Sequence, residues 1–402
     1  MKDPIREISI VGAGPAGAHL ASRLAEVGRD VILFDAKGAW EKPCGGGVPT
    51  RAIREFAFLL EDSHYPRNLV RRLTLISPAE RRVTVRLEEP FAIYSRRDLN
   101  GLILDRALKA GAEFVRASVR DFSREGDGWI IKTGDGRKFY TRFLVGADGA
   151  ASFTRRRLLG IFPACDIALA FGYNVTSNGD FNRKNSPVEE EALVRFPKNF
   201  TGYLWAFPRP GVMNFGVASK LGERTSDNLR DLLSNFVMDY YGGRMPSPDR
   251  LSFFGAKIPT LDLSSWTGLR ASGDRWALVG DAAGFCDPIT GEGIYYALKS
   301  ADLLADLLIA SCSEQAADGY SRAVALYEEL WREAFGKELE KASHRLPMFY
   351  HGRFYGHDFS DAVVRLARYH KGVRTVLARA VMGDQSYVTL KQDLLRCIWQ
   401  VF

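Results

Sequence analysis

A glycine-rich turn near the start of the chain restricts the fold more than any other feature of the sequence. Its pattern, GxGxxG, is formed by Gly12, Gly14 and Gly17. An apolar run at residues 5–11 predicts a buried strand before the turn, and helical spacing of apolar residues predicts a helix over 15–27. The first glycine allows the bend, the second lets a pyrophosphate approach, and the third lets the helix pack closely. The helix start, with Pro15 and Ala16, offers N–H groups and a positive dipole to that anion.

An acidic residue follows at the distance that a dinucleotide requires. Asp35 ends a second predicted strand, residues 31–35, and lies 23 residues after Gly12. A carboxylate at this position accepts hydrogen bonds from the adenosine ribose hydroxyls. An incidental glycine-rich turn is the alternative, but the strand, helix and acid together favour a dinucleotide site. These residues do not distinguish NAD from FAD.

Two later Gly-Asp segments favour FAD. Residues 144–149 and 279–284 each predict a strand that runs into Gly-Asp, at Asp148 and Asp281. Asp281 would accept a hydrogen bond from a ribityl hydroxyl. The helix after Gly293 would direct N–H groups at the flavin edge where negative charge grows on reduction. A single Gly-Asp pair is more often a plain turn, whereas three such strand ends in this order are specific.

The pattern changes along the chain and predicts interleaved domains. Residues 160–265 are rich in aromatic residues, Gly and Pro with short alternating runs, which is typical of an antiparallel sheet. We predict an α/β fold, with a Rossmann-like FAD-binding domain interleaved with an antiparallel-sheet substrate domain, plus a helical C-terminal region. The predicted boundaries are 1–155 with 266–317 for the FAD-binding domain, 51–92 contributing in part to the substrate side, 156–265 for the substrate domain and 318–402 for the C-terminal region.

The positive charge of the chain is concentrated near its end. The 402 residues carry 55 Lys and Arg against 48 Asp and Glu, and residues 341–402 alone hold ten basic and four acidic residues. Helical spacing there, interrupted at Gly372, predicts a basic amphipathic helix whose apolar residues are Val363, Leu366, Val373 and Leu377. Such a helix can make a peripheral contact with an anionic membrane, and a packed helix with a solvated basic face is the alternative. Aromatic residues are not interleaved with this cluster, so nucleic acid is not expected.

Several classes of protein are excluded by what the sequence lacks. Its five cysteines, among them Cys44, Cys286 and Cys312, form no CxxC pair, and its six histidines show no metal spacing, so no metal site is predicted. No window of about twenty uncharged apolar residues exists, so no transmembrane helix is predicted. The first residues lead directly into a predicted strand, so no signal peptide is expected. We expect a cytoplasmic protein, with membrane association as an open alternative.

At this point the sequence resembles the glutathione-reductase-type flavoproteins in their aromatic-hydroxylase-like branch, and within it the geranylgeranyl reductase family. The resemblance covers roughly residues 5–310. It implies an FAD-dependent oxidoreductase. The residues that it implies as FAD contacts in the first two motifs and around them are Gly12, Gly14, Pro15, Ala16, Gly17, Asp35, Ala36, Arg96, Val119 and Asp148, and Asp281 begins the third motif.

Three segments favour the reductases over the hydroxylases of this branch. Residues 42–48 resemble the Pro-Cys-Gly loop that passes close to the flavin in the family, which implies cofactor contacts at Cys44, Gly45, Gly46 and Gly47. Residues 284–294 resemble the end of the third motif, which implies contacts at Gly291, Gly293 and Ile294. Residues 203–208 match the substrate-side signature YxWxFP, although Phe200 stands where the family has proline.

The catalytic candidates are Cys44, Tyr203 and Trp205. A thiol beside the flavin would donate a proton to one alkene carbon, and the alternative is that Cys44 only packs. Tyr203, Trp205 and Phe207 alternate on a predicted strand, so all three face one side and would line an apolar substrate tunnel. A plain aromatic core is the alternative. For Cys286, buried packing is the favoured interpretation.

The resulting hypothesis is an FAD-dependent reductase that saturates carbon–carbon double bonds of a prenyl or lipid-like substrate. No second GxGxxG follows, so the electron donor would be NADPH without a domain of its own, or a reduced protein. A flavin monooxygenase or halogenase on an aromatic or polyketide-like substrate is the first alternative. An electron-transfer flavoprotein dehydrogenase is the second. The sequence makes no prediction of the oligomeric state.

Overall fold

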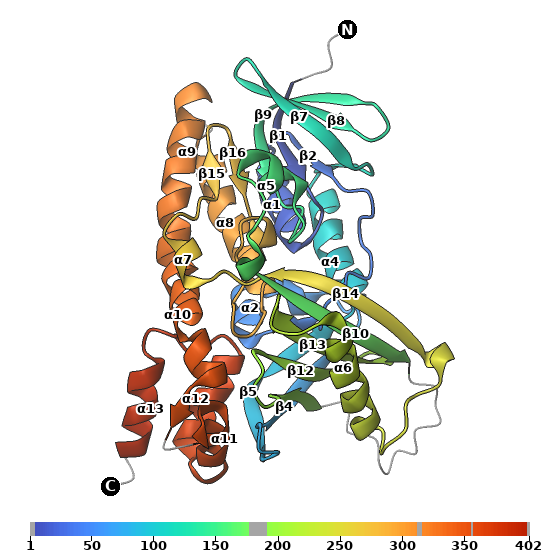
Figure 1. The fold of residues 1–402 in the computed structure, drawn as a ribbon. Helices are drawn as coiled ribbons and strands as arrows, with labels where there is room; N and C mark the ends of the chain where they lie inside the picture. The colour runs from blue at the N-terminus through green and yellow to red at the C-terminus, as the bar shows by residue number, and fades with distance from the viewer. Residues whose placement is uncertain (1–4, 177–190, 312–315, 355–356, 400–402) are drawn as a thin grey trace.

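The chain forms two large sheets with helices packed around them (Figure 1). The structure is a computed structural model, and it describes residues 5–176, 191–311, 316–354 and 357–399. Cys312 lies outside these ranges. The α/β fold class is confirmed, with mixed sheets and a helical C-terminal region.

The first sheet has a parallel core assembled from distant parts of the chain. The strand β1 (Ile5–Val11) pairs in parallel with β2 (Val31–Phe34) on one side and β9 (Lys138–Gly146) on the other. On the β9 side the sheet continues into β16 (Trp276–Leu278), which pairs in parallel with β9 although more than a hundred residues separate them. The remaining strands are β6 (Glu113–Val115), β7 (Val119–Glu125), β8 (Gly128–Thr133) and β15 (Ser272–Gly273).

Three helices pack together beside this sheet, and each of them begins at a segment that holds predicted cofactor residues. They are α1 (Pro15–Glu26), α4 (Arg96–Lys109) and α8 (Ile294–Ala310). Proline at the first position starts α1, because its fixed φ suits a helix and its missing N–H has no helical partner to lose. The Ser95 hydroxyl caps α4 by accepting from the Asp98 N–H at 3.4 Å.

The second sheet takes strands from both sides of the second Gly-Asp motif. Its strand order is β14 (Leu251–Pro259), β10 (Ile167–Thr176), β13 (Val212–Lys220), β12 (Gly202–Arg209), β11 (Glu191–Arg195), β4 (Arg67–Ile76), β5 (Arg82–Tyr94) and β3 (Gly47–Val48). The prediction of an antiparallel sheet is wrong at one pair, because β4 and β11 run parallel. A parallel pair here needs a long connection, and the chain passes through the first sheet between these two strands.

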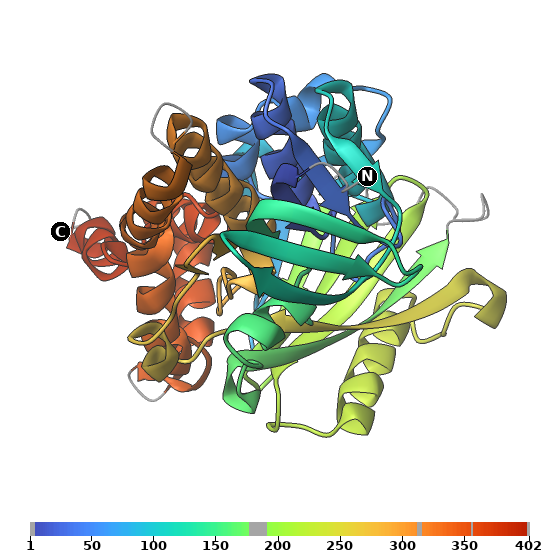
Figure 2. The same cartoon turned by 90° about the horizontal axis from the view of Figure 1, so that it is seen from above.

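Helices cover both faces of the second sheet. On one face, α6 (Ser226–Tyr240) buries Leu229, Leu233 and Phe236 against Phe215 and Val217 of β13. On the other face, near β4 and β5, lie α11 (Phe359–Tyr369) and α12 (Lys371–Val381), with further apolar contacts from α13 (Leu390–Trp399). In Figure 2 the helices after residue 316 gather on the left of the molecule and α6 with β14 on the right.

The shorter elements connect these layers. A π-helical turn, Arg332–Gly336, links α9 (Ala316–Trp331) to α10 (Lys337–His351). The others are α2 (Thr50–Glu55), α3 (Phe58–Glu61), α5 (Phe153–Leu158), α7 (Leu263–Trp266), β17 (Arg353–Phe354), β18 (His357–Asp358) and the 3₁₀ turns at Ala164–Asp166, Pro248–Arg250 and Gly280–Ala282.

The predicted basic helix is two helices, and its buried face differs from the prediction. The chain turns at His370, one residue before Lys371 begins α12. In α11 the buried side chains include Val364 and Ala367, whereas Leu366 is 37% exposed. The break at residue 370 resets the helical register, so one apolar stripe cannot run through both helices. Within the described parts of the chain, no helix combines the length and apolar character that crossing a bilayer requires.

Candidate functional site

The glycines of the first motif occupy the turn between β1 and α1. Gly12 has a φ of +107°, and a Cβ there would overlap the Ala147 carbonyl. A Cβ on Gly17 would overlap the Gly12 carbonyl. Gly14 faces open space, with no atom within 4 Å of a Cβ built on it. The turn is therefore closed at its base and open at Gly14, where a pyrophosphate can approach the backbone.

Asp35 ties this turn to the loop after β2. Its Oδ2 accepts from the Ala13 N–H at 2.9 Å, and its Oδ1 accepts from the Lys37 and Gly38 N–H groups at 2.7 and 3.0 Å. The carboxylate thus fixes the shape of the nucleotide end of the site. Ala36 is exposed beside it, and Val119 begins β7.

The Asp148 carboxylate forms hydrogen bonds with residues that follow it in the chain. Its carboxylate accepts from the Ser152 hydroxyl and from the N–H and hydroxyl of Thr154, the latter two at 2.9 and 3.1 Å. These bonds hold the start of α5. The neighbouring Ala147 and Gly149 line the cavity described next, whereas Asp148 does not. The Asp148 carboxylate thus shapes this strand end, and its contact with the cofactor stays a prediction.

A single cavity of about 250 Å³ brings most of the predicted site residues together. It begins at the first glycine motif and reaches the second sheet. The predicted residues that line it are Gly14, Pro15, Ala16, Cys44, Gly45, Gly46, Gly47, Arg96, Tyr203, Trp205, Phe207, Asp281, Gly291, Gly293 and Ile294. The predicted residues outside its lining are Gly12, Gly17, Asp35, Ala36, Val119 and Asp148.

The loop that carries Cys44 is held by a buried arginine from the second sheet. Arg209, the last residue of β12, donates to the Cys44 carbonyl, and to the Gly45 carbonyl at 3.4 Å. Its Nη1 also lies 2.7 Å from the Glu41 carboxylate. Gly46, with a φ of +78°, lets the loop pass the Tyr94 carbonyl, which a Cβ would strike.

Glu41 links the same arginine to the first turn of α4. Its carboxylate accepts from the Ser95 hydroxyl at 2.7 Å and from the Arg96 and Arg97 N–H groups at 3.2 and 3.3 Å. Burial opposes ionisation of Glu41, but the Ser95 hydroxyl, the Arg209 cation and these N–H groups hold its pKa below the ordinary value. The ionised carboxylate therefore fixes α4, the Cys44 loop and β12 relative to one another.

Arg96 lies between this clamp and the cavity. Its Nη2 donates to Asn100 at 3.2 Å, but its buried Nε has no hydrogen-bond partner among the described residues. A buried guanidinium N–H without a partner is costly unless a ligand accepts from it. Together with the open face at Gly14, this N–H fits a cofactor that brings an anionic or carbonyl oxygen into the cavity, as FAD does.

The Cys44 thiol lies in a positive environment. Burial by itself raises its pKa, but the Arg96 and Arg209 cations and a hydrogen bond from the Gly46 N–H outweigh burial and bring the pKa below the ordinary value. The Gly46 nitrogen is 3.3 Å from Cys44 Sγ. Cys286, which also lines the cavity, behaves oppositely, since burial and surrounding carboxylates raise its pKa well above the ordinary value.

The third motif supplies a carboxylate and a helix start, and a cation from the Cys44 loop lies beside the carboxylate. Lys42 Nζ lies 3.4 Å from Asp281 Oδ2 at the cavity wall. A Cβ on Gly293 would lie 3.1 Å from Asp281 Oδ1, so glycine lets the start of α8 approach this strand end. The N-cap residue of α8, Gly293, has no side chain to cap the helix. The Glu292 carboxylate accepts instead from the Tyr295 N–H at 2.7 Å and from the Ile294 N–H.

Three aromatic side chains of β12 form the wall opposite the glycine motif. The ring centroids of Tyr203 and Trp205 lie 5.8 Å apart, and those of Trp205 and Phe207 lie 6.3 Å apart. The Tyr203 hydroxyl donates to the Thr290 carbonyl of the third-motif loop. A Cβ on Gly45 would lie 3.1 Å from the Phe207 ring. The aromatic wall thus contacts both cofactor-side loops.

Four charged residues of the site did not emerge from the sequence reasoning: Glu41, Lys42, Arg209 and Glu292. Lys42 and Glu292 lie inside two segments that carry the family resemblance. Their charge within a cofactor motif could have identified both as site residues. Arg209 directly follows the YxWxFP signature and Glu41 directly precedes the Cys44 loop. Their contact joins positions 168 apart in the chain, and no local pattern predicts it.

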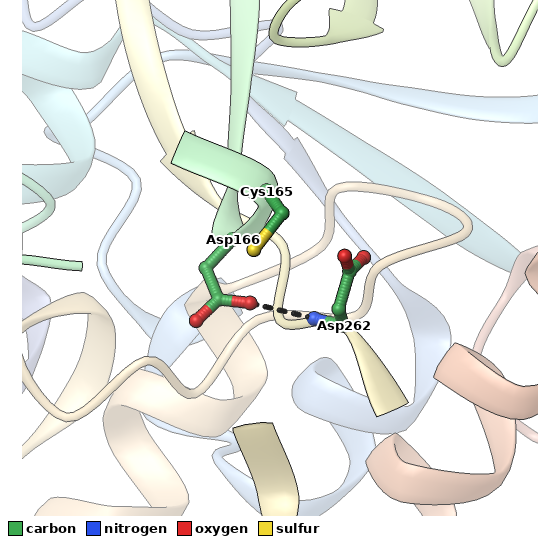
Figure 3. A group of neighbouring side chains, drawn as sticks. All are labelled: Cys165, Asp166 and Asp262. Carbon is green, nitrogen blue, oxygen red and sulfur yellow. Dashed lines mark hydrogen bonds between the residues drawn. The ribbon is translucent and has the colours of Figure 1, made fainter. Parts of the chain in front are cut away.

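Figure 3 shows a second group of polar side chains, none of which lines this cavity. Cys165, Asp166 and Asp262 bring possible metal ligands together. However, Lys220 Nζ lies 2.8 Å from Asp262 Oδ1, so a cationic side chain already serves this carboxylate. Asp166 Oδ1 accepts from the Asp262 N–H at 2.8 Å and the Ser265 hydroxyl at 2.9 Å. The group thus fastens the start of α7 to β10.

Comparison with known proteins assigns the cofactor. The FAD binding domain family matches residues 6–172, which hold the first two motifs, Cys44 and Arg96. The chain therefore has an FAD-binding domain, and the features of the cavity fit that cofactor.

Among proteins of known sequence, the chain is similar to geranylgeranyl diphosphate reductase of Rhodobacter capsulatus. The two are 32% identical over 302 residues, which cover 72% of this chain and 71% of that protein. Among solved structures, a geranylgeranyl bacteriochlorophyll reductase-like protein from Thermoplasma acidophilum superposes with a TM-score of 0.76 at 21% identity, over 98% of this chain and 99% of that one. The flavin-dependent brominase Bmp2 gives 0.71 at 15% identity, over 99% and 100%. The two structural likenesses show a shared fold only.

Proposed function

This chain belongs to the geranylgeranyl reductase family of FAD-dependent oxidoreductases, and from that premise we propose that it saturates carbon–carbon double bonds of a prenyl chain. The substrate is of the geranylgeranyl type, apolar over most of its length. The relative in Rhodobacter capsulatus is named for that activity, which supports the proposal without deciding the substrate of this chain.

One observation carries the proposal: a single cavity runs from the FAD motifs to an apolar aromatic wall. Gly14 and Arg96 line it on the cofactor side, and Tyr203, Trp205 and Phe207 line it on the other. Further apolar residues of this lining are Phe91, Val194, Phe196, Phe254, Ile258, Phe349 and Val381. A hydrocarbon chain fits such a wall because burying apolar surface is favourable by about 25 cal/mol per Å².

One set of residues would hold the cofactor, and another would position the substrate alkene. Gly14, the start of α8 and Arg96 would hold FAD, which when bound and reduced supplies a hydride to one alkene carbon. The aromatic wall positions the alkene and excludes water. An isolated double bond has no carbonyl that an oxyanion hole would polarise, so orientation and a proton source carry the catalysis.

The electron donor belongs to the proposal as well. We propose NADPH or a reduced protein as the donor, since the sequence holds one GxGxxG motif and the first sheet uses it for FAD. Reduction of the flavin by NADPH in the absence of any other protein distinguishes these two donors.

We also propose that the C-terminal helices touch an anionic membrane surface, from which a lipid-like substrate would enter. Leu366 is 37% and Tyr369 is 81% exposed, and the exposed Arg365 and Arg368 stand beside them on α11. The next helix, α12, reaches the cavity through Val381. Apolar and basic side chains on one surface suit a bilayer interface, where each basic residue contributes about 1 kcal/mol.

An anaerobic single turnover tests the proposed activity. FAD-loaded protein is reduced with dithionite and mixed with geranylgeranyl diphosphate or a geranylgeranylated lipid under nitrogen. We expect flavin reoxidation and a product heavier by two hydrogens per bond. Reoxidation that requires oxygen, with a product that gains oxygen or a halogen, would instead establish the monooxygenase or halogenase alternative. Electron transfer to a quinone without change to the alkene would establish the dehydrogenase.

A further inference from the structure

Saturating a double bond requires a proton at one carbon as well as a hydride at the other, so the chain must provide an acid. The sequence singles out Cys44 for this role. The structure places a second acid on the lining of the same cavity: Glu292, between Gly291 and Gly293 ahead of α8.

We propose that Glu292, rather than Cys44, is the proton donor to the alkene, an inference that rests on the proposed function. The carboxyl is anchored at the start of α8. Its Oε1 accepts from the Tyr295 N–H at 2.7 Å, and the Ile294 N–H also donates to this carboxylate. The side chain is half-buried, and it contributes to the cavity lining.

The backbone beneath this carboxyl is held in place. The Asp287 N–H donates to the Glu292 carbonyl at 2.8 Å, and the Gly291 N–H donates to the Asp287 carbonyl at 2.8 Å. The Thr290 hydroxyl accepts from the Glu292 N–H at 3.3 Å. A loop closed by these bonds keeps the carboxyl in one position, which a general acid needs in order to meet the reacting carbon.

The charged and titratable groups around Glu292 come from several elements. Asp287, Cys286 and Asp281 belong to its own motif, Tyr295 and Tyr296 to α8, Tyr203 to β12 and Arg51 to α2. Burial, assisted by the Asp287 carboxylate and opposed by backbone N–H groups and Arg51, raises the pKa of Glu292 to about 8. The pKa of Cys44 shifts below its ordinary value, because burial is outweighed by Arg96 and Arg209.

These shifts run in opposite directions. The pKa of Glu292 is raised to about 8, so this carboxyl keeps its proton near pH 7, whereas Arg96 and Arg209 make the Cys44 thiol more acidic than an ordinary thiol. A carboxylic acid that remains protonated near pH 7 can donate a proton to the alkene. We assign Cys44 a structural role: its sulfur accepts from the Gly46 N–H and offsets part of the positive charge of Arg96 and Arg209.

The proposed step is balanced in atoms and electrons. The double bond receives a hydride at one carbon from the reduced cofactor and uses its own electron pair to take the Glu292 proton at the other. The O–H bond of Glu292 breaks as the new C–H bond forms, and the carboxylate is left behind. Glu292 then regains a proton from water before the next turnover.

The test compares single-turnover reoxidation rates of dithionite-reduced, FAD-loaded variants across pH. For the wild-type chain we expect the rate to fall as pH rises through about 8, where Glu292 loses its proton. Glu292→Gln should be slower by about 10²–10⁴-fold and should lack this fall. Its flavin content and its reduction by dithionite should match the wild-type chain. Glu329→Gln, an exposed carboxylate on α9, should behave as the wild-type chain.

Cys44→Ser decides between the two acids. We expect it to keep the fall in rate near a pH of about 8 and to lose much less activity than Glu292→Gln. If Cys44→Ser abolishes the pH dependence while Glu292→Gln keeps it, the proposal is wrong.

A spectroscopic readout separates failure of this inference from failure of the proposed function. The infrared spectrum of the FAD-loaded chain should contain a carboxylic acid C=O band that disappears as pH rises through about 8 and is missing in Glu292→Gln. A wild-type chain that reduces no prenyl substrate would overturn the proposed function, and the band would still report whether Glu292 carries a proton. A band unchanged in Glu292→Gln would overturn the inference.

Discussion

Arg209 Nη1 lies 2.7 Å from Glu41 Oε1, and this ion pair joins the last residue of the aromatic strand to the loop that carries Cys44. The Arg209 side chain is only 3% exposed. The same guanidinium donates to the carbonyls of Cys44 and Gly45. The relative placement of flavin-side loop and substrate-side wall therefore depends on one buried cation.

Removing this cation should loosen the loop. We expect Arg209→Met to lower the free energy of unfolding by about 1–3 kcal/mol, because the Glu41 carboxylate and two carbonyls lose their donor. Alkene reduction should fall further than stability alone explains, since the loop is no longer fixed. Chemical denaturation and single-turnover kinetics measure both. Arg137→Met, which removes an exposed ion pair with Asp135, should change stability by no more than about 0.5 kcal/mol.

The first glycine motif predicts two different defects. A Cβ at Gly14 meets no atom and projects at the cavity, so Gly14→Ala should fold normally but bind FAD at least about tenfold more weakly, which corresponds to about 1.4 kcal/mol. A Cβ at Gly17 overlaps the Gly12 carbonyl, so Gly17→Ala should lower the melting temperature of the apoprotein. Flavin titration and thermal unfolding distinguish the two. The exposed Gly268→Ala serves as control, and equal FAD affinity in Gly14→Ala would contradict the assignment.

The thiols should differ in reactivity toward iodoacetamide. Because the positive surroundings lower the pKa of Cys44, its alkylation rate should reach half its maximum below the ordinary thiol value of 9.0. Cys165 should require a higher pH, since desolvation and the Asp166 and Asp262 carboxylates raise its pKa. Peptide mass spectrometry resolves each site. Bound FAD should protect Cys44 and leave Cys165 unchanged, and the opposite order of reactivity would refute the electrostatic assignment.

Tyr203 should limit the length of the substrate. It lines both the main cavity and a smaller one of about 30 Å³, which also contacts Tyr350. Tyr203→Ala should open a passage between them and shift kcat/KM toward prenyl chains longer by one isoprene unit, by roughly tenfold. Tyr203→Phe keeps the ring but loses the hydrogen bond to the Thr290 carbonyl, so it should keep the wild-type length preference. If the wild-type chain and both variants prefer the same prenyl-chain length, Tyr203 does not limit the length of the substrate.

The proposed membrane contact should depend on charge. The double variant Arg365→Glu/Arg368→Glu should bind phosphatidylglycerol vesicles more than about tenfold more weakly in a flotation assay, with the remaining binding reduced further by salt. Arg120→Glu/Arg142→Glu changes the same charge at exposed positions of the first sheet and should bind as the wild-type chain. Equal loss in both variants would indicate non-specific attraction, and no loss in either would exclude α11 as the contact.

Local sequence was sufficient wherever a feature depends on neighbouring residues. The turn at Gly12 and Gly17, the proline that starts α1 and the acid that ends β2 are each defined within about one βαβ unit. The aromatic side chains of β12 share a face because side chains alternate along a strand. These features predicted the FAD-binding fold, which the family comparison confirms.

Prediction from sequence failed for structural features that depend on which distant segments pack against each other. The parallel pairing of β4 with β11 joins strands separated by the whole second Gly-Asp motif, and local alternation does not specify direction. The buried face of α11 likewise follows from the turn at His370 rather than from the spacing of apolar residues.

The sequence by itself determined that this chain has a glycine turn of the dinucleotide-binding type between a strand and a helix and presents aromatic side chains on one strand, because these depend on backbone geometry and alternation. The tertiary structure decided which candidate site residues line the same cavity and in which direction the pKa of each is shifted. A pKa is fixed by burial and by charges brought near in space, so the raised pKa of Glu292 and the lowered pKa of Cys44 exist only once α2, β12 and the two loops have packed together.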